Sequence, residues 1–187
     1  MKRKKRNQHD TIKQLLALAV CVVAFFIVLF TYESHKEPSS ETQFITSIAD
    51  AAIVSGKDSE ILPSIIIAQA ILESEWGRST LSTDANNYFG IKGSYEGASV
   101  EVATTEFYDD VEHDIYDVFK VYPSIEASMR DHALLLTTEN YSSVRSATSY
   151  TEAAIALRNA GYATDPMYAE KLIDIIESYR LFIYDTQ

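Results

Sequence analysis

Glu73 is the residue whose place in the sequence points most directly to chemistry. It closes a short, nearly continuous apolar stretch that begins at Ile65, and Trp76 follows within one helical turn. Loss of solvent at the end of a buried helix, beside an indole, raises the pKa of a carboxyl group. A carboxylic acid that keeps its proton near neutral pH can donate it to a reacting group. The pattern therefore indicates a general acid at Glu73.

Carboxylates among aromatic residues suit the cleavage of glycosidic bonds, which often uses a second carboxylate as base or nucleophile. Glu75 is a poor partner for Glu73, because residues two apart point to different sides of a helix. We expect Glu75 to be solvated instead. A better partner is Glu106, in the later segment ATTEFY. Three nearby acids compete with it for this role: Asp109, Asp110 and Glu112.

Other chemistries lack their sequence signatures. The chain has no G-x-G-x-x-G motif, Walker loop or HExxH motif, and Cys21 is its single cysteine. The histidines show no metal-ligand spacing, so His113 and His132 are interpreted as solvated or structural. No metal site and no cofactor are predicted.

Two helices are expected before and up to Glu73. Ser40 and Gln43 form a capping box that opens the first, which should end near Gly56. Pro63 opens the second, because proline is tolerated in a first turn. This second helix is apolar almost all round but too short to cross a membrane, so it is predicted to lie in the core.

The residue pattern of the chain changes after the second helix. Alternating residues between positions 88 and 122 predict a small antiparallel β-region of two or three strands. Helical patterns return after Pro123, and the last helix is predicted with Asp165 as its N-cap and Pro166 at its first position. The fold class is therefore α+β, with a helical lobe, a small β-lobe and a cleft between them.

The N-terminal part differs from this domain. Residues 1–14 form a basic segment, and residues 15–32 contain an uncharged apolar run. As a helix this run would span about 27 Å, close to the thickness of the hydrocarbon core of a bilayer. We expect an uncleaved transmembrane anchor with a cytoplasmic N-terminus, a tether over 33–43 and an extracellular domain over 44–187. A cleaved signal peptide is one alternative, but the run ends without an A-x-A-like cleavage site. A lipoprotein signal at Cys21 is the other, but Val20 is a poor residue before it and the apolar run continues past Cys21.

Charge divides along the same boundary. Six of the 16 Lys and Arg residues but only one of the 27 acidic residues lie in 1–32, which leaves residues 33–187 with a formal net charge of about −16. Nucleic acid is a poor partner for so acidic a domain, because phosphates favour positive surface. Recognition by hydrogen bonds and stacking is expected instead.

Four segments, in order, resemble glycoside hydrolase family 73, the peptidoglycan β-N-acetylglucosaminidases of autolysins and flagellar hydrolases. They are AQAILES with WG at 68–77, NNYFGIKG at 86–93, TEFY and FKVY at 105–122, and NAGYATDPMYA at 159–169. Together they span roughly residues 44 to 182. The chain is thus similar to this family over nearly the whole predicted domain.

The resemblance implies a lysozyme-like fold with a glycan groove, and it implies roles for individual residues. Glu73 would be the general acid, Glu106 the second catalytic carboxylate, and Tyr168 a catalytic tyrosine. The 2-acetamido group of the substrate is the alternative to Glu106. The implied substrate-binding residues are Trp76, Asn87, Tyr88, Phe89 and Tyr162, with Phe89 expected to be buried and Tyr88 to face the groove. Glu75 departs from the family, where many members have glycine.

The implied activity is that of a membrane-anchored endo-β-N-acetylglucosaminidase. Its partner would be peptidoglycan glycan strands, hydrolysed at the β-1,4 bond between GlcNAc and MurNAc without metal or cofactor. Two alternatives stay open from the sequence: an N-acetylmuramidase or lytic transglycosylase, and a tethered module that binds peptidoglycan without catalysis.

Overall fold

The computed structural model describes residues 22–27, 37–108 and 111–186, with residues 104–108 and 111–115 described by their backbone alone. The chain divides into two units, Met1–Ser39 and Ser40–Gln187. In the first unit residues 22–27 are helical, and the rest of the predicted membrane segment lies outside the described residues. Within the described ranges, no helix has both the length and the apolar character needed to cross a membrane.

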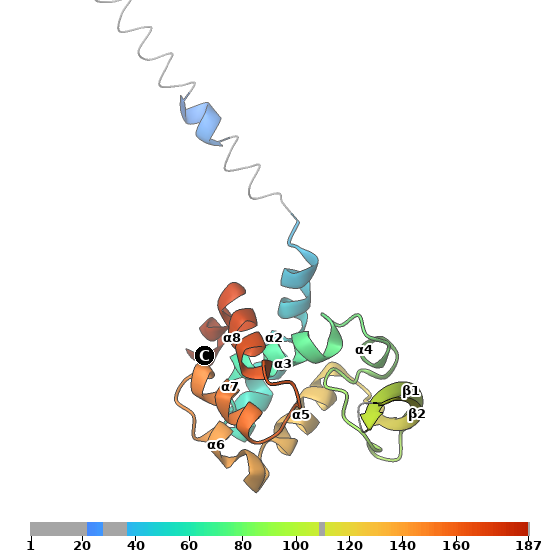
Figure 1. Ribbon diagram of the computed structural model, residues 1–187. Coiled ribbons are helices and arrows are strands. Elements are labelled where there is room, and N and C mark those ends of the chain that lie inside the picture. Colours follow the sequence, from blue (N-terminus) through green and yellow to red (C-terminus); the bar gives the residue numbers. More distant parts are fainter. Residues whose placement is uncertain (1–21, 28–36, 109–110, 187) are drawn as a thin grey trace, which may run out of the picture. The chain divides into compact units, whose positions relative to one another are not determined.

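The second unit combines a set of helices with one β-hairpin, an α+β arrangement as predicted (Figure 1). The elements in chain order are α2 (Ser40–Ser59), α3 (Pro63–Ser74), α4 (Thr80–Ala85), β1 (Ser99–Tyr108), β2 (Val111–Lys120), α5 (Ile125–Leu135), the 3-10 helix η1 (Glu139–Tyr141), α6 (Ser142–Arg145), α7 (Tyr150–Asn159), α8 (Tyr168–Ser178) and the 3-10 helix η2 (Leu181–Thr186).

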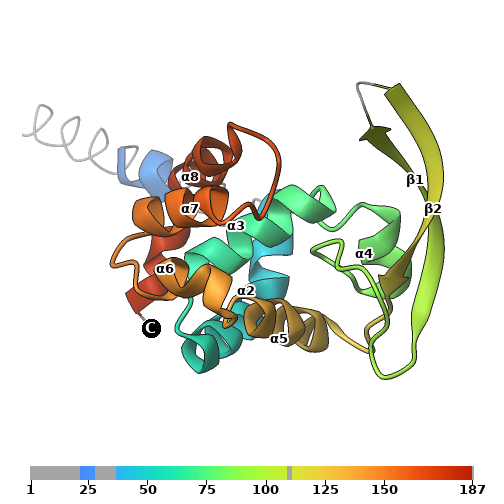
Figure 2. The same ribbon diagram turned by 60° about the horizontal axis from the view of Figure 1, so that its bottom comes forward.

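Helix α3 lies at the centre of the hydrophobic core. All its residues from Ser64 to Ile71 are buried, and it packs against α2, α7, α8 and η2 (Figure 2). Its β-branched isoleucines are moderate helix formers, so the helix depends on burial, worth about 1.5–3 kcal/mol for each such side chain. Pro63 occupies the first turn. The predicted core helix is confirmed.

Strands β1 and β2 form the hairpin, paired antiparallel from Ser99 opposite Lys120 to Tyr108 opposite Val111. Within the described residues the sheet has these two strands alone, and Lys92 adds only an isolated bridge to Phe119. The predicted β-region is thus confirmed at its smaller size. The hairpin projects from the side of the helical part where α4 lies (Figure 2).

The predicted start of the last helix is wrong by a few residues. Helix α8 begins at Tyr168, with Met167 as N-cap, rather than at Pro166. The cause is local: Asp165 Oδ1 accepts a hydrogen bond of 2.8 Å from the backbone N–H of Met167, which closes a turn ahead of the helix. This turn places the side chain of Tyr168 at the first position of α8.

One other boundary and one additional helix also differ from the sequence prediction. Helix α2 continues to Ser59 instead of ending near Gly56. Helix α4 was not predicted at all, although Ser79 caps it by accepting from the backbone N–H of Ser82. Both differences lie away from Glu73 in the sequence and leave the predicted core helix unchanged.

Candidate active site

Glu73 is the second-to-last residue of α3, and it is partly exposed. The hydroxyl of Tyr168 donates a hydrogen bond of 2.8 Å to Glu73 Oε1, joining residues 95 apart in sequence. Tyr168 is the first residue of α8 and is buried. Two of the three predicted catalytic residues are therefore in direct contact.

Burial and the tyrosine act on the pKa of Glu73 in opposite directions. Burial raises the pKa of the Glu73 carboxyl above its ordinary value, and the hydrogen bond from Tyr168 offsets part of the rise. Burial and the charge of Glu73 together raise the pKa of Tyr168, so the hydroxyl stays a donor across the neutral range. A carboxyl with a raised pKa holds its proton closer to neutral pH, as a general acid requires.

Gln69 is a third member of this cluster, and the sequence did not identify it as a site residue. It is fully buried on α3, one turn before Glu73, and its Nε2 donates a 3.0 Å hydrogen bond to the hydroxyl oxygen of Tyr168. The spacing of four residues places Gln69 and Glu73 on one helix face. That spacing was a usable signal, but the contact with Tyr168 was not readable from the sequence.

Aromatic rings continue the cluster away from Glu73. Tyr162 stacks on Tyr168 with ring centroids 5.6 Å apart, and His132 meets Tyr162 edge-on at 5.9 Å. Phe89 stacks face to face on His132 at 3.7 Å. Phe89 is buried, as predicted, whereas Tyr162 keeps partial exposure. Contact between Tyr162 and a glycan stays a prediction.

His132 is a structural residue of this stack. It is fully buried, and neither ring nitrogen has a hydrogen-bond partner among the described residues. Burial lowers the pKa of His132 to about 3. The imidazole is therefore neutral throughout the range in which a free histidine titrates.

The low pKa of His132 makes folding sensitive to acid. The unfolded chain binds a proton at this residue below about pH 6.5 and the folded protein does not, so its stability falls as the pH drops. Between pH 7 and 4.5 we expect the free energy of unfolding of the wild type to fall by roughly 2–3 kcal/mol more than that of His132→Leu. Urea denaturation at both pH values measures this; parallel losses in the two proteins would refute it.

Trp76 is held in a turn of left-handed backbone that follows α3. Glu75, Trp76 and Gly77 have φ values of 52°, 63° and 71°. The indole lies 4.7 Å from the ring of Tyr179 and 6.1 Å from that of Phe44, measured between centroids. A Cβ at Gly77 would come within 2.5 Å of the Phe44 ring, so glycine is required there. Trp76 is partly exposed, and its contact with substrate stays a prediction.

The loop after α4 is held in place by Asn87. Asn87 is 1% exposed, and its amide donates to the backbone oxygens of Ile91 and Lys120 while its Oδ1 accepts from the N–H of Ile91. Its side-chain amide thus holds the loop to the end of β2. Tyr88 is 9% exposed. Contact of Asn87 and Tyr88 with a glycan stays a prediction.

The role of Asn87 predicts a loss of stability on its removal. Asn87→Ala removes three part-buried hydrogen bonds, two to the backbone oxygens of Ile91 and Lys120 and one from the N–H of Ile91, and should lower the free energy of unfolding by about 3 kcal/mol. Asn140→Ala is the matched control, because Asn140 donates one exposed hydrogen bond, to the backbone oxygen of Ala160. Urea denaturation of both variants should separate them; equal, small losses would contradict the assignment.

Glu106 completes the predicted set, and Glu75 was expected to lie outside it. Glu106 lies in β1 opposite His113 in β2, and its side chain is outside the described residues, so its role as second carboxylate stays a prediction. Glu75 is exposed, as expected. Within the part of the chain that the structure describes, no three His, Cys, Asp or Glu side chains are grouped to bind a metal ion.

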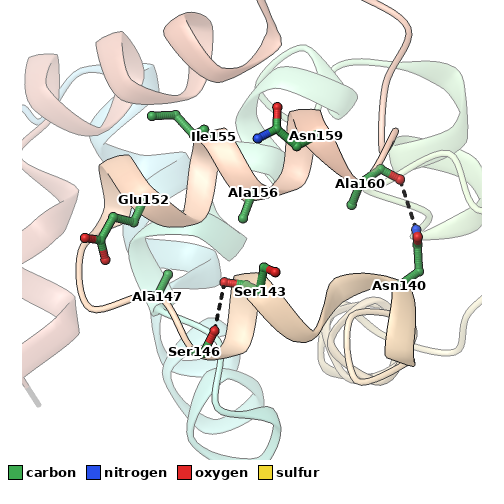
Figure 3. Close-up of a pocket in the computed structure, with 9 residues that line it drawn as sticks. All are labelled: Asn140, Ser143, Ser146, Ala147, Glu152, Ile155, Ala156, Asn159 and Ala160. Carbon is green, nitrogen blue, oxygen red and sulfur yellow. Dashed lines mark hydrogen bonds between the residues drawn. The ribbon is translucent and has the colours of Figure 1, made fainter.

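A surface hollow lies elsewhere, between α6 and α7 (Figure 3). Most of its lining residues are serine or alanine, and at one end Asn140 donates a hydrogen bond to the backbone oxygen of Ala160. The lining residues are Asn140, Ser143, Ser146, Ala147, Glu152, Ile155, Ala156, Asn159 and Ala160. None of them is a predicted site residue. The hollow is therefore separate from the Glu73 cluster.

Comparison with known proteins assigns the cluster to a family. The sequence model described as glucosaminidase, mannosyl-glycoprotein endo-beta-N-acetylglucosaminidase, matches residues 49–181. The chain belongs to the glucosaminidase family, glycoside hydrolase family 73. It is accordingly a glycoside hydrolase. The matched range contains every predicted site residue, including Glu73, Glu106 and Tyr168.

Relatives in this glucosaminidase family differ in what their names state. The chain is 39% identical to the exo-glucosaminidase LytG of Bacillus subtilis, over 99% of this chain and 70% of that protein. It is 40% identical to a probable N-acetylmuramidase of Lactococcus lactis subsp. lactis, over 79% of this chain but 35% of that protein.

Solved structures share the fold of this chain. The catalytic domain of the autolysin Auto from Listeria monocytogenes superposes with a TM-score of 0.74 at 41% identity, covering 80% of this chain and 90% of that chain. The mixed fold of helices with a small antiparallel sheet is thus the lysozyme-like fold of the family.

Proposed function

We propose that this glucosaminidase is a membrane-anchored endo-enzyme that hydrolyses the β-1,4 bond between GlcNAc and MurNAc in peptidoglycan. The observation that carries the proposal is the contact of Glu73 with the buried hydroxyl of Tyr168. It joins a carboxyl of raised pKa to a neutral donor, inside a domain whose family cleaves glycosidic bonds.

In the proposed reaction Glu73 is the proton donor. The bond between C1 of GlcNAc and the bridging oxygen breaks as the proton of Glu73 moves to that oxygen, which leaves on MurNAc. The carboxylate left on Glu73 accepts the hydrogen bond from Tyr168, which stabilises its new charge. Water then adds its oxygen to C1 and gives a proton to Glu106. In the alternative, the 2-acetamido oxygen bonds to C1 as the bridging oxygen leaves, and water then displaces it and gives a proton to the carboxylate of Glu73.

Product analysis tests both the bond and the mode of attack. The full-length protein is incubated with purified peptidoglycan, and the new ends are reduced with borohydride and identified by mass spectrometry. Reduced GlcNAc on fragments of mixed length is the expected result. Reduced MurNAc would indicate the muramidase alternative, anhydro-MurNAc a transglycosylase, and release of small terminal sugars alone an exo-enzyme; each would overturn the proposal.

The membrane anchor rests on the sequence of residues 15–32, which carries no charge and follows a basic segment. In this arrangement the glucosaminidase domain faces the cell wall and acts on strands near the membrane. Fractionation of cells followed by protease treatment of protoplasts tests it. The intact chain should be in the membrane fraction with the domain open to external protease, and an intact chain in the culture fluid would contradict the anchor.

A further inference from the structure

We propose that Gln69 is a positioning residue for the reaction: its side-chain amide holds the hydroxyl of Tyr168 in the orientation that donates to Glu73. The inference rests on the proposed role of Glu73 as proton donor. It adds a residue that touches neither the substrate nor the reacting atoms and acts through Tyr168.

The hydrogen-bond directions define this role. Gln69 Nε2 can only donate, so at 3.0 Å the oxygen of Tyr168 must be the acceptor. A tyrosine hydroxyl carries a single hydrogen, which is then directed to Glu73 Oε1 at 2.8 Å. The opposite orientation of the amide would place Oε1 against the tyrosine oxygen and compete for that hydrogen. The observed orientation leaves the hydrogen to Glu73.

The buried amide of Gln69 is unfavourable for the stability of the fold. Its side chain is fully buried in α3 among isoleucine and alanine, and its Oε1 has no hydrogen-bond partner among the described residues. An amide with an unpaired buried oxygen is less stable at such a position than an apolar side chain of similar size. The hydrogen bond that the amide does make is to Tyr168, which points to a role in the active site.

The hydrogen bond from Gln69 affects the electrostatics of Glu73 through Tyr168. Accepting a hydrogen bond from Gln69 polarises the Tyr168 O–H group and strengthens its donation to the carboxylate that forms when Glu73 releases its proton. Among the described residues, the titratable groups that respond to the charge of Glu73 are Tyr162 and Tyr168. Burial raises the pKa of both, so both stay neutral, and Tyr168 is the one bonded to Glu73.

The test is a double-mutant cycle on kcat and on the pH dependence of kcat/KM. Gln69→Met keeps the length of the side chain and removes the donor. We expect kcat to fall about three- to tenfold, the loss typical of a weakened hydrogen bond, and the basic limb of the profile to move to higher pH. In a Tyr168→Phe background the same change should alter neither quantity further. Ile67→Met is the control for a methionine in the core of α3 and should leave the basic limb in place.

Stability gives the cycle a second readout. Tyr168→Phe removes the acceptor of Gln69 Nε2 and leaves that buried donor unpaired, so adding Gln69→Met in this background should raise the melting temperature. An unmoved basic limb in Gln69→Met, or losses in kcat that multiply in the double variant, would overturn the role of Gln69. That outcome is distinct from failure of the proposed function, in which Glu73→Gln itself would keep its activity.

Discussion

Glu73→Gln should lower the rate of peptidoglycan hydrolysis by about 10²–10⁴-fold, the usual contribution of a general acid. Glutamine matches the size of the side chain and accepts the hydrogen bond of Tyr168, but it has no acidic proton to give to the leaving oxygen. The rate is measured as reducing ends released from purified peptidoglycan. A variant within tenfold of the wild type would remove Glu73 from the mechanism.

Glu75→Gln is the matched control for this variant. Glu75 is exposed and lies two residues further along, and it undergoes the same replacement of a carboxyl by an amide, so the activity of this variant should stay near that of the wild type. The melting temperature of Glu73→Gln tests whether misfolding causes the loss of rate. Because burial raises the folded-state pKa of Glu73, its stabilising contribution is present at low pH and is lost as the pH rises through that pKa. Glu73→Gln should therefore melt no lower than the wild type at neutral pH.

Tyr168→Phe should lower kcat by about 10- to 150-fold. The lost interaction is a hydrogen bond to the carboxylate formed on proton transfer, and hydrogen bonds to charged groups are worth about 1.5–3 kcal/mol. The pH dependence should change as well. The hydrogen bond lowers the pKa of Glu73, so its removal lets that pKa rise and moves the basic limb of the activity profile to higher pH.

The control for Tyr168→Phe is Tyr150→Phe. The Tyr150 hydroxyl also donates to a carboxylate, Glu177 Oε1 at 3.2 Å, on an exposed part of the surface. Its removal should leave both kcat and the basic limb unchanged. A loss in Tyr168→Phe with no shift of the limb would show that the tyrosine packs the site without acting on the titration of Glu73.

The sequence predicted the features that depend on local pattern. The apolar run before Glu73 and the proline at its start defined the core helix, and the alternation of residues defined the hairpin. The role of Tyr168 came from the family resemblance. Its contact with Glu73 joins residues 95 apart, and no spacing rule predicts such a contact.

Competition between equally plausible partners for one polar side chain limits what the sequence predicts. Asp165 was expected to cap the last helix, but it closes a turn on the N–H of Met167. The amide of Asn87 donates to the backbone of the neighbouring loop and strand, a contact that the sequence did not predict. Residue type and spacing do not decide between such partners, because the choice depends on which groups the fold brings together.

The titration of Glu73 itself tests the account most directly. Protein labelled with ¹³C at glutamate side-chain carboxyls is titrated by NMR, with Glu73→Gln used to assign the signal, and the result is compared with the pH dependence of kcat/KM, which reports the free enzyme. We predict that Glu73 titrates above the ordinary glutamate value of about 4.3 and that its pKa coincides with the basic limb of the profile. An ordinary pKa for Glu73, or a basic limb that follows another group, would contradict its role as the proton donor.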